Sequence, residues 1–325
     1  MKLKTAEYVR KGHPDRVCDI ISDAIVDEYI KQDPNSRVAV DVFGCHGIIT
    51  VGGEVTSKAI VDIPKVVKST YQEIGYKDEI GVQVNIVKQS PEIGELANEG
   101  AGDSGIVVGY ATDETKEMLP LEVVLAKRIC LRLDTLPWLK PDGKVQVTLK
   151  EKEIENLVVS VQGDQEKAEE LKSILQNEFP HKELHLTIYG IGGFEADSGL
   201  TGRKNVLWYG PKIPTGGGAF AGKDATKVDR SGAYYARYLA IEAIKKYGLK
   251  ECLVELAFVI GKNKTVMVRV KGIDKNEKAI NVVFPNLKEV NVSEMIEKLN
   301  LKKSIFKETS LKGHFGHKDF SWELS

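Results

Sequence analysis

The order of hydrophobic and polar positions along the chain predicts one α+β arrangement that returns three times. Apolar positions recur at helical spacing, then alternate over two strands, then return to helical spacing before a further strand. The first round comprises a helix over residues 14–30, strands over 37–43 and 48–55, a helix over 64–74 and a strand over 80–87. Gly75 ends the second of these helices, as glycine often does.

The two later rounds repeat this order. The second comprises a helix over 120–133, strands over 144–150 and 157–161, a helix over 165–179 and a strand over 184–189. The third comprises a helix over 231–247, strands over 251–260 and 265–271, and a helix over 293–299 capped by Ser293, while its last strand is not distinct. We therefore expect a threefold repeat of α+β subdomains, spanning 1–91, 103–189 and 190–325. Sheets that carry helices on one face need a partner for the other, so we also expect an oligomer.

Four aspartates recur at every fourth position of the first predicted helix, namely Asp15, Asp19, Asp23 and Asp27. Residues four apart lie on the same side of a helix. The apolar positions of this helix occupy another side. We interpret the acidic row as a mostly solvated face.

Composition limits the partners that the chain can have. It has 325 residues, of which 42% are hydrophobic and 29% charged, and its formal net charge is -1. Binding to nucleic acid or to an anionic membrane needs clustered basic residues in excess, so we expect neither partner. No apolar run approaches the ~18 residues of a membrane span and no signal peptide is evident, so we expect a cytoplasmic protein. The four cysteines lack metal-site spacing, and we expect reduced, mostly buried thiols.

The stretch GGGAFAGKDATKVDR, residues 216–230, comes close to a phosphate-binding loop. A Walker loop has Ser or Thr after its lysine to hold magnesium, whereas Asp224 follows Lys223 here. A carboxylate at that position would repel phosphate unless it is turned away, which argues against a P-loop nucleotide hydrolase. The glycines let backbone approach a ligand, and Lys223, Lys227 and the hard oxygen of Asp229 suit polyphosphate with magnesium.

Two other stretches add similar chemistry. GHPD, residues 12–15, places His13 and Asp15 at the start of a helix, where Asp15 either binds magnesium or simply complements the helix dipole. DSGLTGRK, residues 197–204, adds an acidic residue and two basic ones. Tyr189 ends a predicted strand with its ring toward this stretch, where it either stacks on a nucleobase or belongs to the core.

Most of these residues fall in two glycine-rich segments, 89–105 and 190–230. The segments are either functional loops or linkers, and their short fixed patterns of Lys and Asp favour functional loops. Eight motifs follow one another along the chain: GHPDRVCDIISDAIVD, GGEVTSKA, KQSPEI, GAGDSGIVVGYATDET, LPWLKPDGKVQV, DSGLTGRK, GGGAFAGKDATKVDRS and HFGHKDFSWE. In this order they closely resemble the methionine adenosyltransferase (S-adenosylmethionine synthetase) family, from His13 to Glu323.

This resemblance implies a fold, an activity and a set of partners. The implied fold has three similar α+β subdomains with pseudo-threefold symmetry, whose sheets pack inward and at a dimer interface. The implied substrates are ATP and L-methionine, bound between two subunits of a homodimer or of a dimer of dimers. The methionine sulfur attacks C5′ of ATP, and the released triphosphate is hydrolysed to pyrophosphate and phosphate. Magnesium is the implied cofactor, together with potassium.

The resemblance also assigns a role to each matching residue. Catalytic contacts fall on His13, Lys144, Lys223 and Lys227. ATP contacts fall on His13, Asp142, Lys144, Tyr189, Asp197, Arg203, Lys204, Ala219 and Lys223. Methionine contacts fall on Glu54, Gln89, Asp197 and Lys227, and the magnesium carboxylates are Asp15 and Asp229. Asp41 stands at the position of the family's potassium-binding Glu, which predicts a weaker potassium effect, and Asp103 belongs to the family's GAGD loop element.

Two other functions stay open at this point. A non-catalytic relative that binds ATP should have lost one of the metal or lysine contacts, and none is lost. A triphosphatase would not need Glu54 and Gln89 around methionine. The chain departs from the family pattern at Lys11, Arg16, Ile188 and Ser198. Its loop over 94–99 is also short, so we expect it to close less completely over the site.

Overall fold

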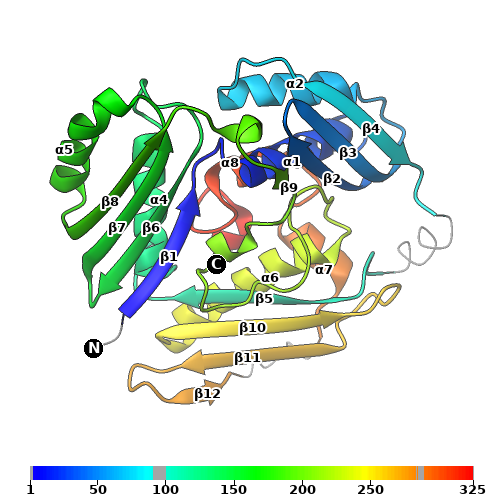
Figure 1. The fold of residues 1–325 in the computed structure, drawn as a ribbon. Coiled ribbons are helices and arrows are strands. Elements are labelled where there is room, and N and C mark those ends of the chain that lie inside the picture. Colours follow the sequence, from blue (N-terminus) through cyan, green and yellow to red (C-terminus); the bar gives the residue numbers. More distant parts are fainter. Residues whose placement is uncertain (1–2, 91–99, 283, 285–288, 325) are drawn as a thin grey trace.

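The computed structural model describes residues 3–90, 100–282, 284 and 289–324, and it has the predicted α+β architecture (Figure 1). Its described helices are α1 (Pro14–Gln32), α2 (Ile63–Ile74), α4 (Leu121–Leu133), α5 (Ala168–Glu178), α6 (Val228–Tyr247), α7 (Val292–Lys298) and α8 (Phe306–Lys312). Its described strands are β1 (Leu3–Val9), β2 (Arg37–Cys45), β3 (Ile48–Thr56), β4 (Gly81–Val87), β5 (Gly105–Thr112), β6 (Gly143–Lys150), β7 (Glu153–Gln162), β8 (His181–Tyr189), β9 (Gly199–Leu200), β10 (Glu251–Phe258), β11 (Met267–Ile273) and β12 (Ala279–Asn281). The short loop expected over 94–99 lies outside the described residues.

The described strands form three four-stranded sheets, with the orders β1-β6-β7-β8, β4-β3-β2-β9 and β12-β11-β10-β5. Each contains one of the three predicted antiparallel hairpins, β2-β3, β6-β7 or β10-β11. In two sheets the next strand is parallel to the hairpin, as β4 is to β3 and β8 is to β7. The third sheet ends instead on the short antiparallel strand β12, which explains why no clear strand pattern follows its hairpin.

The sheets exchange strands in a cycle, which the hydrophobic pattern did not predict. Strand β1, from the first predicted subdomain, pairs with β6 of the second. Strand β5 begins the second predicted subdomain but pairs with β10 of the third. Strand β9 comes from the third and pairs with β2 of the first. The subdomain boundaries predicted from the sequence remain a proposal. Each of the three sheets includes one strand from a different predicted subdomain.

One long helix covers one face of each sheet. Helix α1 packs on β2, α4 on β1 and β6, and α6 on β5 and β10, so that α1, α6 and α8 lie between the sheets in Figure 1. Close packing requires glycine where α6 crosses β5, because a Cβ on Gly109 would lie 2.0 Å from the backbone carbon of Ala236. The opposite faces of the sheets carry no helix in Figure 1.

The starts of α6 and α7 differ from the prediction. Helix α6 begins at Val228 rather than at residue 231, which places Asp229 in its first turn. Asn291, not Ser293, caps α7, because the Asn291 side-chain oxygen accepts hydrogen bonds from the N–H groups of Ser293 and Glu294. The prediction of free cysteines is confirmed, with Cys45 half-buried and the others buried.

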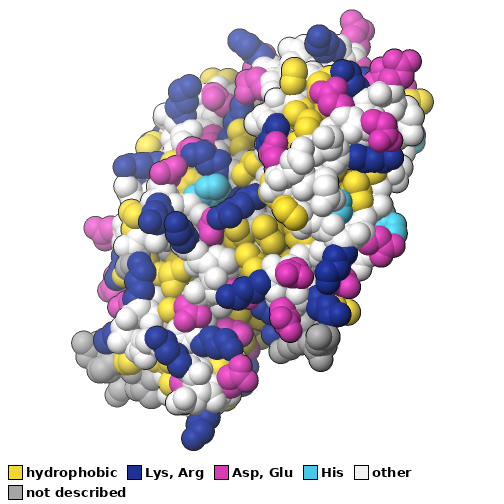
Figure 2. All heavy atoms as spheres, turned by 90° about the vertical axis from the view of Figure 1, so that its left-hand side faces the viewer, with side chains coloured by type: hydrophobic (Ala, Val, Ile, Leu, Met, Phe, Trp, Pro, Cys, Tyr) yellow, Lys and Arg dark blue, Asp and Glu magenta, His cyan; other side chains and the backbone are white. Residues whose placement is uncertain are grey.

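The surface seen in Figure 2 is the left-hand side of Figure 1. Apolar side chains gather across the middle of this face, and Lys, Arg, Asp and Glu side chains of both signs surround them. None of the helices in the described part of the chain is long and apolar enough to cross a membrane.

Candidate active site

The strand exchange brings the beginning of α1 against the beginning of β6. Because Val9 of β1 lies opposite Lys144, the chain after β1 runs directly beside the residues before β6. The N–H of Gly12 donates to the Pro141 carbonyl at 3.1 Å, and a Cβ on Gly12 would lie 2.5 Å from Pro141. The glycine of GHPD therefore permits a contact that places His13 close to Asp142 and Lys144.

His13 caps α1. Its Nδ1 accepts a hydrogen bond from the N–H of Asp15 at 3.2 Å. Burial and, next, the Lys204 ammonium lower the pKa of His13 to about 4, with Asp15 opposing them. The imidazole is therefore neutral at pH 7. Since Nδ1 is an acceptor, its proton resides on Nε2 and is free to be donated.

Asp15 is almost fully buried, and the DSGLTGRK stretch surrounds it. Its Oδ1 accepts from the N–H of Leu200 at 3.0 Å and lies 3.3 Å from Nε of Arg203. Its Oδ2 lies 2.6 Å from Nζ of Lys204. Strand β9 positions these residues, since Leu200 pairs with Phe43 at the edge of β2. A carboxylate and two cations thus meet at the N-terminus of α1.

A second carboxylate and lysine meet at the N-terminus of α6. Nζ of Lys223 donates to Oδ2 of Asp229 at 2.5 Å. A Cβ on Gly218 would lie 2.1 Å from the Asp229 carboxyl carbon, so the glycine-rich loop, residues 216–222, lies directly against this carboxylate. The side chain of the N-cap residue Lys227 makes no capping hydrogen bond at the start of α6, and such a helix N-terminus attracts anions. Asp224 is turned away, because its two oxygens accept from the N–H groups of Val38 and Thr226.

The two helix N-termini belong to one site, because their loops touch. A Cβ on Gly202 would lie 2.5 Å from the Cβ of Ala219. The Asn205 side chain donates to the Gly218 carbonyl at 3.0 Å. The stretch that holds Asp15 is therefore packed against the stretch that holds Asp229.

Tyr189 and Asp142 lie at one end of this site. Asp142 is buried, and its Oδ2 accepts from the N–H of Gly193 at 2.8 Å. Burial and then the nearby Asp142 carboxyl raise the pKa of Tyr189. Asp197 is exposed and is close enough to His13 to act on its pKa. Tyr189 is half-buried rather than part of the core, which leaves its ring accessible to a ligand.

Glu54, Asp41 and Lys223 share the open face of the β4-β3-β2-β9 sheet. Glu54 lies opposite Ala39 on β2, Ala39 lies opposite Lys223 in an isolated bridge, and residues opposite each other point to the same face. Asp41 is two residues from Ala39 and so points the same way. Desolvation raises the pKa of Asp41, and the Lys223 ammonium opposes that shift.

Three further residues expected in the site, Lys227, Asp103 and Gln89, have fewer contacts with the two helix N-termini. Lys227 donates to the Gly102 carbonyl at 3.4 Å, and Gly102 itself donates to Thr226, so the neighbouring Asp103 lies beside the start of α6. Gln89 is buried, and its Oε1 has no hydrogen-bond partner among the described residues. In the described part of the chain, no hydrogen bond or ion pair joins Gln89 to the two helix N-termini.

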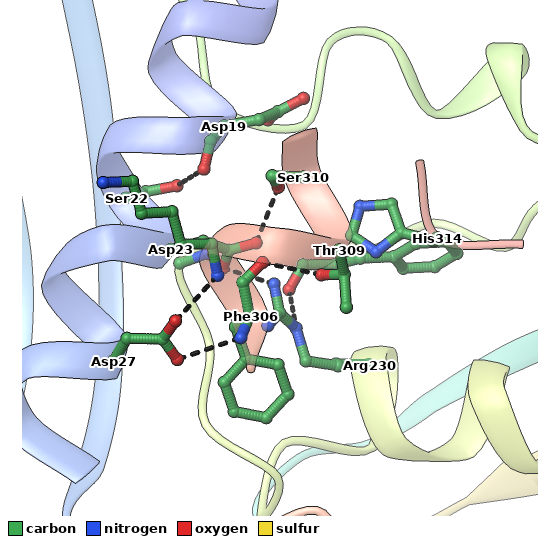
Figure 3. A network of polar contacts seen from close by, with 12 residues as sticks. Asp19, Ser22, Asp23, Asp27, Arg230, Phe306, Thr309, Ser310 and His314 are labelled. Atoms are coloured by element: carbon green, nitrogen blue, oxygen red, sulfur yellow. Dashed lines mark hydrogen bonds and ion pairs between the residues drawn. The ribbon is translucent and has the colours of Figure 1, made fainter. Parts of the chain in front are cut away.

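The interpretation of the acidic row as a solvated face is wrong. All four of its aspartates are buried, and they contact segments that lie far away in sequence, as Figure 3 shows for Asp23 and Asp27. The physical reason is that α8 packs along α1 over Asp23 and Asp27, while residues 199–204 pack over Asp15 and Asp19, so this side of the helix is covered. Asp19, Asp23 and Asp27 therefore belong to the interior that supports the site, and the sequence offered only their regular spacing as a signal.

Magnesium suits the two carboxylates of the site. Over residues 3–90, 100–282, 284 and 289–324, no three His, Cys, Asp or Glu side chains are close enough to hold a metal by themselves. Magnesium in nucleotide sites uses one or two carboxylates and completes its shell with phosphate oxygens and water. Asp15 and Asp229 each lie against a lysine, and a bound triphosphate would take those lysines and free the carboxylates for the metal.

Comparisons with known proteins indicate the same family over almost the whole chain. Models of the N-terminal, central and C-terminal domains of S-adenosylmethionine synthetase match residues 1–96, 98–189 and 191–324. The S-adenosylmethionine synthase of Thermus thermophilus is 38% identical over an alignment of 379 positions, which covers 99% of this chain and 96% of that protein. That of Aquifex aeolicus is 37% identical over 364 positions, covering 99% of this chain and 96% of that protein. That of Mycoplasma capricolum is 38% identical over 365 positions, covering 99% of this chain and 94% of that protein. The chain belongs to the S-adenosylmethionine synthetase family.

Proposed function

We propose that the chain synthesises S-adenosylmethionine from ATP and L-methionine. The observation that carries this proposal is the meeting of two carboxylate–lysine pairs, Asp15 with Lys204 and Asp229 with Lys223, at adjoining helix N-termini beside His13. This arrangement suits a triphosphate with magnesium. The open sheet face next to it carries Glu54, where a small zwitterion such as methionine can bind.

The methionine sulfur attacks C5′ of ATP in line, and the bond from C5′ to the triphosphate oxygen breaks. Sulfur needs no general base, so the protein has to align the reactants and stabilise the charge that develops on the leaving oxygen. His13 donates from Nε2 to this oxygen, because its Nδ1 is held by the N–H of Asp15. Arg203, Lys204 and Lys223 neutralise the phosphates together with Lys144.

Asp15 and Asp229 would hold magnesium, which would supply further charge neutralisation on the triphosphate. The adenine ring stacks on Tyr189, with Asp142 and Ala219 lining the same end of the site. Methionine is held by Glu54, Gln89, Asp197 and Lys227. Asp103 belongs to the loop that borders this pocket.

The site lies between two copies of the chain. Glu54 is on the open face of its sheet, and the same face carries exposed apolar side chains, such as Phe43, Ile48 and Leu200. A second subunit on this face would bury these side chains and enclose the methionine end of the site.

Methionine should be required for any release of phosphate. With ATP, magnesium and methionine, we expect pyrophosphate and phosphate in equal amounts, each matched by one S-adenosylmethionine. Coupled assays for the two phosphates, with chromatography of the nucleoside, measure the three products. Phosphate release that proceeds without methionine would mean an ATP hydrolase, and tight ATP binding without products would mean a non-catalytic relative.

Potassium should activate this chain only weakly. The Asp41 carboxylate is about 1.5 Å shorter in reach than Glu, and the Lys223 ammonium on the same face disfavours another cation there. The rate should be measured against KCl at constant ionic strength, with choline chloride as the replacement salt. Asp41→Glu should increase the activation. A strong, saturable effect of potassium that Asp41→Asn abolishes would contradict this expectation.

A further inference from the structure

The buried acidic row of α1 connects three separate segments of the chain. Asp15 accepts from Leu200, Asp19 from Gly202, Asp23 from Gly222, and Asp27 from Phe306 and Lys307, each time at a backbone N–H. Leu200 and Gly202 belong to the DSGLTGRK stretch, Gly222 to the glycine-rich loop, and Phe306 and Lys307 to α8. One stripe of α1 thus holds both loops of the site.

Asp23 and Arg230 form the central contact of this network (Figure 3). The Arg230 Nη2 donates to Oδ1 of Asp23, and both side chains are completely buried. Oδ2 of Asp23 accepts from the Ser310 hydroxyl at 2.6 Å, and the Arg230 guanidinium lies 4.3 Å from the centre of the Phe306 ring. An ion pair so far from water is held in one geometry by its surroundings.

The same two side chains hold the glycine-rich loop between them. Arg230 donates through Nε to the Phe220 carbonyl, and Asp23 accepts from the Gly222 N–H at 2.9 Å. Gly222 has φ of +79°, and a Cβ there would lie 1.9 Å from the Val40 carbonyl oxygen, so the loop has no room to shift. The next residue is Lys223.

The ion pair therefore joins the two helices and the loop that carry Asp15, Lys223 and Asp229. Arg230 follows Asp229 directly in the first turn of α6. Asp23 lies eight residues after Asp15 on α1, about 12 Å along the helix. A change in the Asp23–Arg230 distance would move Asp15, Lys223 and Asp229 relative to one another.

We propose that Asp23 and Arg230 are positioning residues of the active site, which set the separation of the two magnesium carboxylates and the place of Lys223. This inference rests on the proposed function, in which Asp15 and Asp229 hold magnesium with ATP. Neither Asp23 nor Arg230 touches the substrate. They act through the backbone of α1, α6 and residues 220–222.

The chain provides a matched control for a purely structural role. Arg237, also on α6, forms a similarly buried ion pair with Glu323, whose side chain is 5% exposed, at 2.8 and 2.9 Å. Its other partners are the carbonyls of Tyr110, Glu117 and Met118, away from the site. Glu323→Gln and Asp23→Asn each remove one buried charge and keep the shape of the side chain, so they should cost similar stability.

The test measures metal binding without turnover. Mn²⁺ replaces magnesium, the β,γ-imido analogue replaces ATP, methionine is left out, and free Mn²⁺ is followed by electron paramagnetic resonance. Asp23→Asn should weaken Mn²⁺ binding to the protein–nucleotide complex by about 10–100-fold, as loss of residues that orient metal ligands usually does. Glu323→Gln should stay within about twofold of the wild type, while thermal melting reports comparable destabilisation of both variants.

Equal binding by Asp23→Asn and the wild type, or equal weakening in both variants, would overturn the proposal. If Asp23→Asn does not fold, Arg230→Lys takes its place, because it keeps the charge but loses the Nε donor to Phe220. If Arg230→Lys then binds Mn²⁺ as tightly as the wild type does, the proposal is also overturned. Asp15→Asn and Asp229→Asn report on the metal site itself, so binding that is unaffected by these two variants would show that the proposed function has failed instead.

Discussion

Replacing Lys223 with methionine should lower kcat by about two to three orders of magnitude, which is the usual effect of removing one charge-stabilising contact from a reacting group. Lys223 is fixed by the turn at Gly222 and points to the open sheet face, where its ammonium meets Asp229. In the proposed reaction it neutralises the triphosphate as the bond to C5′ breaks. Methionine keeps much of the length and volume of lysine but has no charge.

The rate of S-adenosylmethionine formation in a single turnover, measured by chemical quench, isolates this step from product release. Lys172→Met is the control, because Lys172 is a surface lysine of α5 that pairs with Glu169, away from the site. It should leave the rate unchanged. A Lys223→Met enzyme that reacts within about threefold of the wild type would show that Lys223 does not act on the triphosphate.

The second large effect concerns magnesium. Asp15→Asn and Asp229→Asn should each raise the magnesium concentration needed for half-maximal activity by more than about tenfold, because a neutral amide holds a hard cation far less well than a carboxylate. Each change also leaves a lysine, Lys204 or Lys223, without its acidic partner. Activity should therefore recover only in part at saturating magnesium.

Magnesium titrations at fixed ATP and methionine measure this shift. Asp164→Asn is a matched control: Asp164 also accepts a hydrogen bond from a backbone N–H at a helix start, that of Glu166 at 3.0 Å, but it lies outside the site. It should leave the titration unchanged. Unshifted titrations in both Asp15→Asn and Asp229→Asn would remove these carboxylates from the metal site.

Local patterns were sufficient to predict most helices and hairpins, because each buries one face with its own periodicity. The helix expected over residues 14–30 is α1, and the hairpin expected over 37–55 is β2-β3. The cyclic exchange of β1, β5 and β9 could not be predicted in this way. The pairing of Leu3 with Lys150 joins residues far apart in sequence, and no local period records it.

The site shows the same division. The chemistry of the glycines, lysines and aspartates in residues 216–230 can be predicted from the local sequence. The orientation of Asp224 agrees with the expectation that a carboxylate facing the site would repel phosphate. The burial of the acidic row is not evident in the local sequence, because aspartates at every fourth position look the same on a solvated helix and on one covered by α8 and residues 199–204. Only the distant partners, such as Arg230 and Ser310, distinguish the two cases.

The most direct test of the reaction follows one oxygen atom. ATP is prepared with heavy oxygen at the bridge between C5′ and the α-phosphorus, and the products with methionine are analysed by mass spectrometry. Attack of sulfur on C5′ predicts S-adenosylmethionine without the label, and all the heavy oxygen in the pyrophosphate and phosphate. Heavy oxygen that stays with the adenosine product, or phosphate release without any S-adenosylmethionine, would contradict the proposed function.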